Sequence, residues 1–548
     1  MGWTKEQQAA IDKREANILV SAAAGSGKTA ILTQRVINRV IGNEHEEPID
    51  IDRFLIVTFT NAAAMEMKER IANKLIEKIQ EIESLNNPFP EDERQIAYLE
   101  KQLSLLQTAS ISTIHSFCLK TIKSYFNVLD IDPNVQVANE ADLTIMKLEI
   151  LENLIEEKFE EGNQDFFEVA QLYGDIGGMQ QLTQMILDIN TFSKSTLFPY
   201  EWLRQHANKL CVPYKTLEET PWAKDIKDNV IEKITDLIKV YEYAIFLCDH
   251  PSGPEVYKQA LESDLSYLIK AKDVQTLDDL CKIMKSVTFE KLKSVKKDSC
   301  DPDIKELITS YRKFGKDTIN KIKDELDLIS EEHTLLHIMQ AGKVIKTIVE
   351  LVIDFDRRFY EAKKEQGLVD YNDLEHLCLQ LLVKRETDEE GNETLVYTDI
   401  AQELGNFYKE IYIDEYQDSN NVQETILKAI AGLDKDIKTT RFMVGDMKQS
   451  IYRFRLANPL IFASKYDSWD KWQEGVFEEN KGNICIELSR NFRSRENIIN
   501  GVNDLFEQIM SKRVGDIEYN SFAKLKVGNP YDQGDISGKE IADNIQLY

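Results

Sequence analysis

Two short segments of this chain carry residue types that together could bind and cleave a triphosphate. One ends an apolar run with Asp414, whose carboxylate could reach Mg²⁺, and Glu415, which could accept a proton from an attacking water. The other is a Gly-rich turn in which the Lys28 ammonium and the Thr29 hydroxyl follow backbone N–H groups suited to phosphate. This turn comprises Ala22, Ala23, Ala24, Gly25, Ser26, Gly27, Lys28 and Thr29. The pairing predicts hydrolysis of ATP with Mg²⁺.

Each segment has a plainer alternative. The turn departs from the pattern G-x-x-x-x-G-K-[ST] because Ala22 replaces the first Gly, so it could be an ordinary Gly/Ala-rich turn. A strand candidate at 17–21 and an amphipathic helix candidate at 31–40 flank it in the order that phosphate binding requires. Acidic pairs are common in a chain with 95 acidic residues, but this pair follows the apolar run 411–413. Open α/β sheets bind ligands at such strand ends.

The elements that must position these residues alternate between strands and helices. Residues 54–57 are a second strand candidate, and a helical pattern begins at Ala62. Strand texture returns at 411–413, 442–445 and 484–488. Strands that alternate with helices favour a parallel sheet. We therefore expect an α/β fold of the P-loop NTPase type.

Changes in composition and hydrophobic spacing along the chain predict three domains. Residues 141–365 are rich in Leu, Ile, Lys and Glu at helical spacing, which predicts an all-α insertion. Residues 1–140 and 366–475 would form the first α/β domain around it, and 476–548 the incomplete start of a second one. Residues 384–399 look too charged to pack, so we expect a loop there.

Composition narrows the class of protein. The 548 residues include 42% hydrophobic ones, yet no run approaches the roughly 18 apolar residues of a membrane helix. The N-terminus lacks a secretion signal, and the seven cysteines form no C-x-x-C pattern. We expect a cytoplasmic protein with reduced cysteines and no membrane partner. The net charge of −28 argues against nonspecific coating of nucleic acid, so any such contact must be local.

Seven segments follow one another in a recognisable order. They are 3–7 (Trp-Thr-Lys-Glu-Gln), 57–67 (Val-Thr-Phe-Thr-Asn-Ala-Ala-Ala-Met-Glu-Met), 112–117 (Ser-Thr-Ile-His-Ser-Phe), 370–374 (Asp-Tyr-Asn-Asp-Leu), 414–420 (Asp-Glu-Tyr-Gln-Asp-Ser-Asn), 444–455 (Val-Gly-Asp-Met-Lys-Gln-Ser-Ile-Tyr-Arg-Phe-Arg) and 488–494 (Leu-Ser-Arg-Asn-Phe-Arg-Ser). Together they resemble the motifs of UvrD/RecB-like superfamily 1 DNA helicases. Within this superfamily, the chain is most similar to the AddA (RexA) helicase–nuclease subunits in three features: the residues of 447–455, the residues of the loop 21–30, and the long helical insertion. The resemblance covers residues 3 to about 525.

For the nucleotide, the resemblance implies a RecA-like motor domain with several named roles. Gln7 would recognise adenine and Phe492 would stack on it. Many relatives have Arg where this chain has Ala30, so adenine binding would depend more on Gln7 and Phe492. Gln449 would sense the γ-phosphate, and Arg493 would act as an arginine finger. The catalytic set is then Lys28, Asp414, Glu415, Gln449 and Arg493, with Thr29 and Asp414 on the metal. The plain alternative for Arg493 is a surface arginine.

For DNA, the resemblance implies a track of aromatic, polar and basic side chains. Aromatic residues interleaved with basic ones suit single-stranded DNA, because stacking tolerates any base. Core packing is the alternative for the aromatic residues, and a hydrogen-bonded structural role is the alternative for the histidine. The track comprises Thr58, Phe59, Asn61, His115, Tyr452, Phe454 and Arg455.

The function that the resemblance implies is an ATP-dependent 3′-to-5′ DNA helicase, the motor portion of an AddA-type helicase–nuclease in double-strand break repair and recombination. Its expected partners are single-stranded and duplex DNA and an AddB/RexB-like nuclease subunit. A UvrD/PcrA-like repair helicase, an ATP- and DNA-binding module without unwinding, and a platform for a nuclease subunit remain alternatives; an unrelated P-loop kinase is disfavoured by Gln449 and Arg493. The family's fifth and sixth motifs and the nuclease domain do not appear, so we expect weak ATPase activity and no unwinding.

Overall fold

The computed structural model describes residues 2–14, 16–43, 46–84, 90–174, 178–295, 300–329, 331–387, 393–432, 439–475, 482–515, 517–521 and 523–528. The chain divides into two compact units. The first consists of Met1–Ile150, Asn190–Pro199 and Asp356–Tyr548, and the second of Leu151–Ile189 and Tyr200–Phe355. The residues after 528 lie outside the part of the chain that the structure describes.

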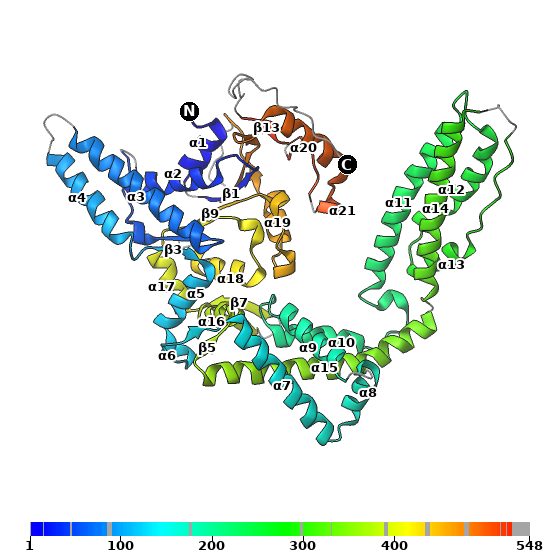
Figure 1. Cartoon of the computed structure of the whole chain (residues 1–548), viewed down its shortest axis with the longest axis horizontal. Coiled ribbons are helices and arrows are strands. Elements are labelled where there is room, and N and C mark those ends of the chain that lie inside the picture. Colours follow the sequence, from blue (N-terminus) through cyan, green and yellow to red (C-terminus); the bar gives the residue numbers. More distant parts are fainter. Residues whose placement is uncertain are drawn as a thin grey trace. The chain divides into compact units, whose positions relative to one another are not determined.

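The first unit is built on a seven-stranded sheet in the order β10-β11-β1-β9-β8-β2-β3, and every neighbouring pair is parallel. The expected α/β fold with a parallel sheet is confirmed. In Figure 1, strands from distant parts of the sequence, such as blue β1 and yellow β9, lie side by side. The bounds are β1 Asn17–Ala22, β2 Phe54–Thr58, β3 Ser110–Thr113, β8 Glu410–Ile413, β9 Thr440–Gly445, β10 Asp470–Lys471 and β11 Asn483–Leu488.

Helices cover both faces of this sheet, and alternate strand residues pack on each face. On one face, Ile18 and Val20 share a core with α1 Lys5–Asp12, α2 Lys28–Ile41, α3 Asn61–Glu83 and α4 Pro90–Leu105. On the other, Leu19 shares a core with α5 Ile114–Ser124, α16 Tyr371–Leu382, α17 Asp399–Phe407, α18 Asn421–Ala431 and α19 Leu460–Ser468. Burial on both faces explains why these strands read as continuous apolar runs.

The strand order decides which loops meet. β9 lies between β1 and β8, with Ser21 opposite Gly445 and Met443 opposite Ile413. The Gly-rich turn after β1, the segment after β8 and the segment after β9 therefore leave the same edge of the sheet. Short 3₁₀ helices follow β8 and β9: η4 Tyr416–Asp418, η5 Met447–Gln449 and η6 Arg453–Arg455.

Two expectations need correction. β11 pairs with β1 along its whole length, so residues 483–488 belong to the first sheet and do not open a second motor domain. Within 384–399, where we expected a loop, the described residues include two strands: β6 Val383–Thr387 and β7 Glu393–Tyr397 pair antiparallel, and residues 388–392 lie outside the described part of the chain. Val383 pairs with Tyr397 and both pack on the core, while Lys384 and Glu386 are exposed. Backbone pairing thus tolerates side chains that cannot be buried.

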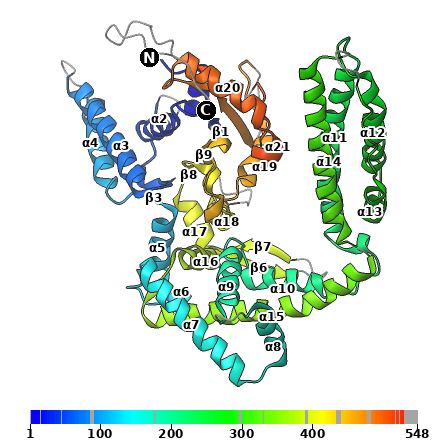
Figure 2. The same cartoon turned by 45° about the vertical axis from the view of Figure 1, so that its right-hand side comes forward.

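The second unit contains helices and no strand in the part of the chain that the structure describes. Figures 1 and 2 both show α11 to α14 running side by side, and their apolar faces form one core. The helices are α7 Glu140–Glu160, α8 Gln164–Tyr173, α9 Gln180–Ser193, α10 Pro199–Leu210, η2 Leu217–Glu219, α11 Ala223–Cys248, η3 Glu255–Tyr257, α12 Lys258–Lys272, α13 Leu277–Ser286, α14 Pro302–Asp327 and α15 Glu331–Glu365. The chain passes from one unit to the other within α7, α9 and α15 and after the first residue of α10.

Smaller elements complete the first unit. They are η1 Ile51–Arg53, α6 Phe126–Leu129, the pair β4 Gln136–Val137 and β5 Leu368–Val369, α20 Glu496–Ile509, α21 Lys512–Gly515, and the pair β12 Arg490–Asn491 and β13 Lys526–Val527. Among the described residues, no helix has the length and apolar character needed to cross a membrane.

Candidate functional site

The Gly-rich turn has the geometry of an anion cradle. Gly25 and Gly27 have positive φ angles of 70° and 86°, and Gly27 caps the N-terminus of α2. The first N–H groups of a helix lack partners inside it and carry partial positive charge. The buried Ser26 hydroxyl finds no hydrogen-bond partner among the described residues. Unused donors around a left-handed turn fit a phosphate group.

The structure brings three of the predicted catalytic side chains together. Lys28 Nζ lies 2.8 Å from Glu415 Oε2 and 3.4 Å from Gln449 Oε1. Asp414 continues the line of β8 and donates its backbone N–H to Val57 O. Residues that follow β1, β8 and β9 in the sequence thus converge as the strand order requires.

The carboxylates of this site are held in an environment that disfavours a lone negative charge. Burial, with the charge of Glu415 added, raises the pKa of Asp414 to about 6. The same two causes raise the pKa of Asp418 to about 6, and its Oδ1 is buried without a partner among the described residues. Mg²⁺ accepts one or two carboxylate oxygens together with phosphate oxygens and water, and Asp414 can supply such an oxygen. The residues therefore fit the ion that the sequence implies.

A buried glutamine that the sequence analysis missed connects the carboxylates to the segment after β9. Gln417 Nε2 donates to Glu415 Oε2 at 2.9 Å, and Gln417 Oε1 accepts from the backbone N–H of Asp446 at 3.0 Å. Asp446 Oδ2 in turn accepts from Gln449 Nε2 at 2.8 Å. A Cβ added to Gly445 would lie 2.4 Å from Gln417 Oε1, so this contact requires glycine. The sequence offers one signal for this contact: Gln417 lies in the motif 414–420 and Asp446 in the motif 444–455.

The residues expected to hold the nucleobase lie beside the Gly-rich turn. Gln7 is buried in α1, and its Nε2 donates to Ser26 O at 2.9 Å. The backbone N–H of Phe492 donates to Gly25 O at 2.9 Å, and that of Arg493 donates to Asn491 Oδ1 at 2.8 Å. A cavity of about 80 Å³ opens here, lined by Thr4, Glu6, Gln7, Ser26, Leu488, Ser489, Arg490, Phe492 and Lys526.

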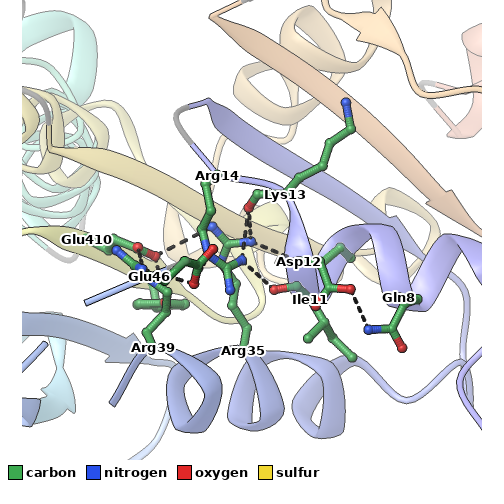
Figure 3. A network of polar contacts seen from close by, with 11 residues as sticks. Gln8, Ile11, Asp12, Lys13, Arg14, Arg35, Arg39, Glu46 and Glu410 are labelled. Atoms are coloured by element: carbon green, nitrogen blue, oxygen red, sulfur yellow. Dashed lines mark hydrogen bonds and ion pairs between the residues drawn. The ribbon is translucent and has the colours of Figure 1, made fainter. Parts of the chain in front are cut away.

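A network of arginines and glutamates fixes α1 against α2 and β8 (Figure 3). Arg35 Nη1 donates to Ala10 O at 3.0 Å and to Lys13 O, which satisfies carbonyls at the end of α1. Glu410, the first residue of β8, pairs with Arg39 at 2.6 Å and with Arg35 at 3.5 Å. The helix that carries Gln7 is therefore tied to the strand that ends at the carboxylates.

A second, larger cavity joins the carboxylates to the predicted DNA track. Its volume is about 790 Å³. Its lining includes Thr58, Phe59, Asn61, His115, Asp414, Glu415, Tyr452 and Arg455. All of these residues belong to the first unit. Phe454 is not part of the lining, and 74% of it is exposed.

The aromatic residues of the track form a continuous row. Phe59 and Tyr452 stack with ring centroids 4.7 Å apart, and Tyr452 and Phe454 follow at 5.9 Å. The Arg455 guanidinium lies 5.3 Å from the Tyr452 ring and 5.6 Å from the Phe454 ring. Exposed stacked rings beside a cation are poor core packing and good base-stacking surfaces. Thr58 differs, because its side chain is buried and its hydroxyl donates to Thr60 O.

His115 also lines this cavity. Its Nε2 is 3.0 Å from the buried carboxylate of Glu375, and its ring centroid is 4.8 Å from that of Tyr371. Glu375 carries no signal of its own in the sequence, although it directly follows the Asp-Tyr-Asn-Asp-Leu segment.

A parallel sheet whose Gly-rich turn opens a helix at a strand's carboxyl end defines the class of P-loop nucleotide-binding proteins. The chain belongs to the UvrD/REP helicase family, because the family model of the UvrD/REP helicase N-terminal domain matches residues 3–470. The resemblance to this superfamily is confirmed.

Curated relatives named as ATP-dependent helicase/nuclease subunits of the AddA type are similar to most of the chain. That of Clostridium botulinum is 37% identical over 533 residues, which cover 96% of this chain and 41% of the relative. The relatives from Clostridium beijerinckii and Bacillus cytotoxicus are 36% and 38% identical, and cover 100% and 98% of this chain and 42% of each relative. The chain spans about two fifths of the length of the curated relatives it matches.

Proposed function

We propose that this chain is the ATP-hydrolysing, DNA-binding motor portion of an AddA-type helicase–nuclease. The observation that carries the proposal is the cavity of about 790 Å³, in which the carboxylates Asp414 and Glu415 share one lining with Phe59, His115 and Tyr452. Because the site for nucleotide cleavage opens directly onto a surface suited to base stacking, it can couple ATP hydrolysis to DNA binding.

For the nucleotide, the Gly-rich turn and the Lys28 ammonium would bind the phosphates, and Gln7 and Phe492 would bind adenine. Thr29 and Asp414 would hold Mg²⁺, which when bound neutralises phosphate charge. Glu415 would take a proton from the attacking water. Its bond to Lys28 must yield first, because the triphosphate competes for the same ammonium. Gln449, bonded to Asp446, would sense the γ-phosphate, and Arg493 would stabilise the charge that develops on it.

For DNA, the row Phe59, Tyr452 and Phe454 would stack on bases, with Arg455 near the backbone and Asn61, Thr58 and His115 completing the path. Stacking contributes about 1–3 kcal/mol per base. This affinity does not need a basic protein surface, which agrees with the acidic composition.

The names of the relatives describe a helicase/nuclease subunit, and the motif resemblance extends that description to a wider role for the complete protein. We infer 3′-to-5′ movement on single-stranded DNA, unwinding of duplex DNA at double-strand breaks during recombination, and pairing with an AddB/RexB-like nuclease subunit in the cytoplasm.

A fluorescent-oligonucleotide titration tests the proposal. Phe454→Ala removes one exposed ring of the row, and we expect oligonucleotide affinity to fall about 5- to 100-fold, the equivalent of one lost stacking contact. Phe314→Ala is the matched control, because it removes an exposed ring from the second unit. Equal affinity of the Phe454 variant and the unchanged chain would contradict the DNA track. ATP hydrolysis that oligonucleotide does not stimulate would contradict the coupling.

A further inference from the structure

A buried carboxylate connects the DNA side of the large cavity to the nucleotide side. Glu375, on α16, is only 3% exposed, yet it accepts hydrogen bonds from three side chains. Its Oε1 accepts from His115 Nε2 at 3.0 Å and from Gln423 Nε2 at 2.7 Å. Its Oε2 accepts from Asn420 Nδ2 at 2.8 Å. Two helices and the segment after the catalytic carboxylates thus meet at one side chain.

The donors leave no freedom in this arrangement. Asn420 caps α18, because its Oδ1 accepts the backbone N–H of Gln423 at 2.8 Å, so its amide cannot rotate without removing the cap. Its Nδ2 must therefore face an acceptor. Burial raises the pKa of Glu375, but the hydrogen bonds and charge of His115 and the two amide donors lower it further, to below its ordinary value. An acceptor-only, ionised side chain is what this position requires.

The segment between the catalytic carboxylate and Asn420 is rigid. After Glu415, the side chains of Tyr416 and Gln417 are 1% and 2% exposed, and the Tyr416 hydroxyl donates to Glu424 at 2.7 Å. Ser419 O accepts the backbone N–H of Asn458, which follows the aromatic row. A displacement at Asn420 is therefore passed to Glu415 rather than absorbed between them.

We propose that Glu375 is a positioning residue that couples DNA binding at His115 to the nucleotide site through its hydrogen bond with Asn420. The inference rests on the proposed function of the cavity and adds a residue to it. DNA that contacts His115 moves the imidazole against Glu375, and Asn420 carries that movement to the segment that begins with Asp414 and Glu415. By linkage, nucleotide bound at Lys28 changes the affinity for DNA to the same extent.

The experiment measures that reciprocal effect on the whole chain. A fluorescent oligonucleotide is titrated with and without saturating Mg²⁺ and a non-hydrolysable ATP analogue, and the ratio of the two dissociation constants is the coupling ratio. For the unchanged chain we expect a ratio that departs from one by about fivefold or more, as is typical of coupled sites.

Two single substitutions remove the connection in different ways. Asn420→Ser keeps an N-cap on α18 but is too short to reach Glu375. Glu375→Gln keeps the size of the side chain but turns an NH₂ group toward Asn420 or toward the other two donors. We expect both to bring the coupling ratio to within twofold of one, with nucleotide affinity in the absence of DNA within twofold of the unchanged chain.

The double variant E375Q/N420D is the decisive arm. It exchanges donor and acceptor, so that a Gln amide at 375 donates to an Asp carboxylate at 420 that still caps α18. We expect it to restore the coupling ratio to within twofold of the original. Asp356→Asn is the matched control: Asp356 is buried in the same unit and accepts from Asn190 and Lys194, outside the cavity, so the ratio should not change.

The outcomes separate the inference from the function on which it rests. A chain that binds neither the analogue nor the oligonucleotide refutes the proposed function. A chain that binds both with a ratio of one refutes the coupling through Glu375 alone. The inference is also overturned if the Asn420→Ser variant keeps the original ratio, or if the double variant folds and does not regain it.

Discussion

At the scale of single residues, the chemistry of the site is set by charges that lie close together in partly buried positions. Lys28 is the cation closest to Glu415, and its side chain is only 12% exposed. Asp414 and Asp418 both have raised pKa values because they are buried beside Glu415. Each carboxylate therefore affects the affinity of the site for anions as well as its reactivity, and the two effects can be separated by neutral substitutions.

Replacing Glu415 with Gln should improve nucleotide binding and abolish turnover. The substitution frees the Lys28 ammonium and removes a charge that repels phosphate, so we expect roughly fivefold tighter binding of a fluorescent ATP analogue, about 1 kcal/mol. Phosphate release should fall about 10²- to 10⁴-fold, the usual contribution of a general base. Asp467→Asn, an exposed carboxylate paired with Lys512, is the control. Undiminished phosphate release would exclude Glu415 as the base.

Replacing Asp414 with Asn should change how stability depends on pH. The pKa of Asp414 is about 6 in the folded chain against an ordinary value of 3.8. The folded state therefore binds this proton more tightly than the unfolded state, and the stability it contributes is present below pH 3.8 and is lost as pH rises through 6. We expect the Asn variant to be more stable than the unchanged chain at about pH 7.5, on the order of 2 kcal/mol, with the difference vanishing near pH 4. Urea unfolding at both pH values measures the difference in unfolding free energy between the variant and the unchanged chain. A difference that does not change with pH would contradict the raised pKa of Asp414.

At the scale of elements, the site exists because β9 separates β1 from β8. This order brings the segments after three strands to one edge, and contacts between those segments hold the side chains in place. One of them is the approach of Gln417 to Gly445, where a methyl group has no room. The fit between η4 and β9 therefore depends on one glycine and one amide.

Replacing Gly445 with Ala should displace Gln417 and weaken the fold locally. Overpacking of this kind costs about 1–3 kcal/mol. Because the added methyl group collides mainly with Gln417, the cost should be smaller in a chain that already carries Gln417→Ala. Urea unfolding of the two single variants and the double variant gives the interaction energy. Strict additivity would mean that the two residues do not constrain each other.

At the scale of the whole molecule, the chain consists of two units with separate cores. The first contains both cavities and all the predicted site residues, and the second has a helical core of its own. Substitutions in the helical core should therefore act on stability and leave the site intact.

Leu261→Ala tests that separation. Leu261 is fully buried in α12 of the second unit. Its truncation should cost about 2–5 kcal/mol in that unit, seen as a shift of part of the calorimetric transition. Affinity for the ATP analogue should stay within twofold of the unchanged chain. Leu427→Ala, fully buried in α18 of the first unit, is the counterpart that should also weaken nucleotide binding.

The sequence alone determined what depends on neighbours along the chain. The apolar run before Lys28 and the turn residues Gly25 and Gly27 predicted a strand, a phosphate cradle and a helix, because backbone conformation and burial pattern are local properties. The apolar run before Asp414 placed the carboxylates at a strand end for the same reason. A parallel sheet followed from the alternation of strands and helices.

Only the tertiary structure decided which distant segments meet. Residues 483–488 joined the first sheet because their pairing with β1 buries them, and residues 383–387 and 393–397 paired as antiparallel strands because backbone pairing outweighs exposed charge. The roles of Glu375 and Gln417 depend on donors up to 260 residues away in the sequence. A buried polar side chain takes its meaning from the partners that satisfy it, and those partners are fixed by the order in which strands and helices pack.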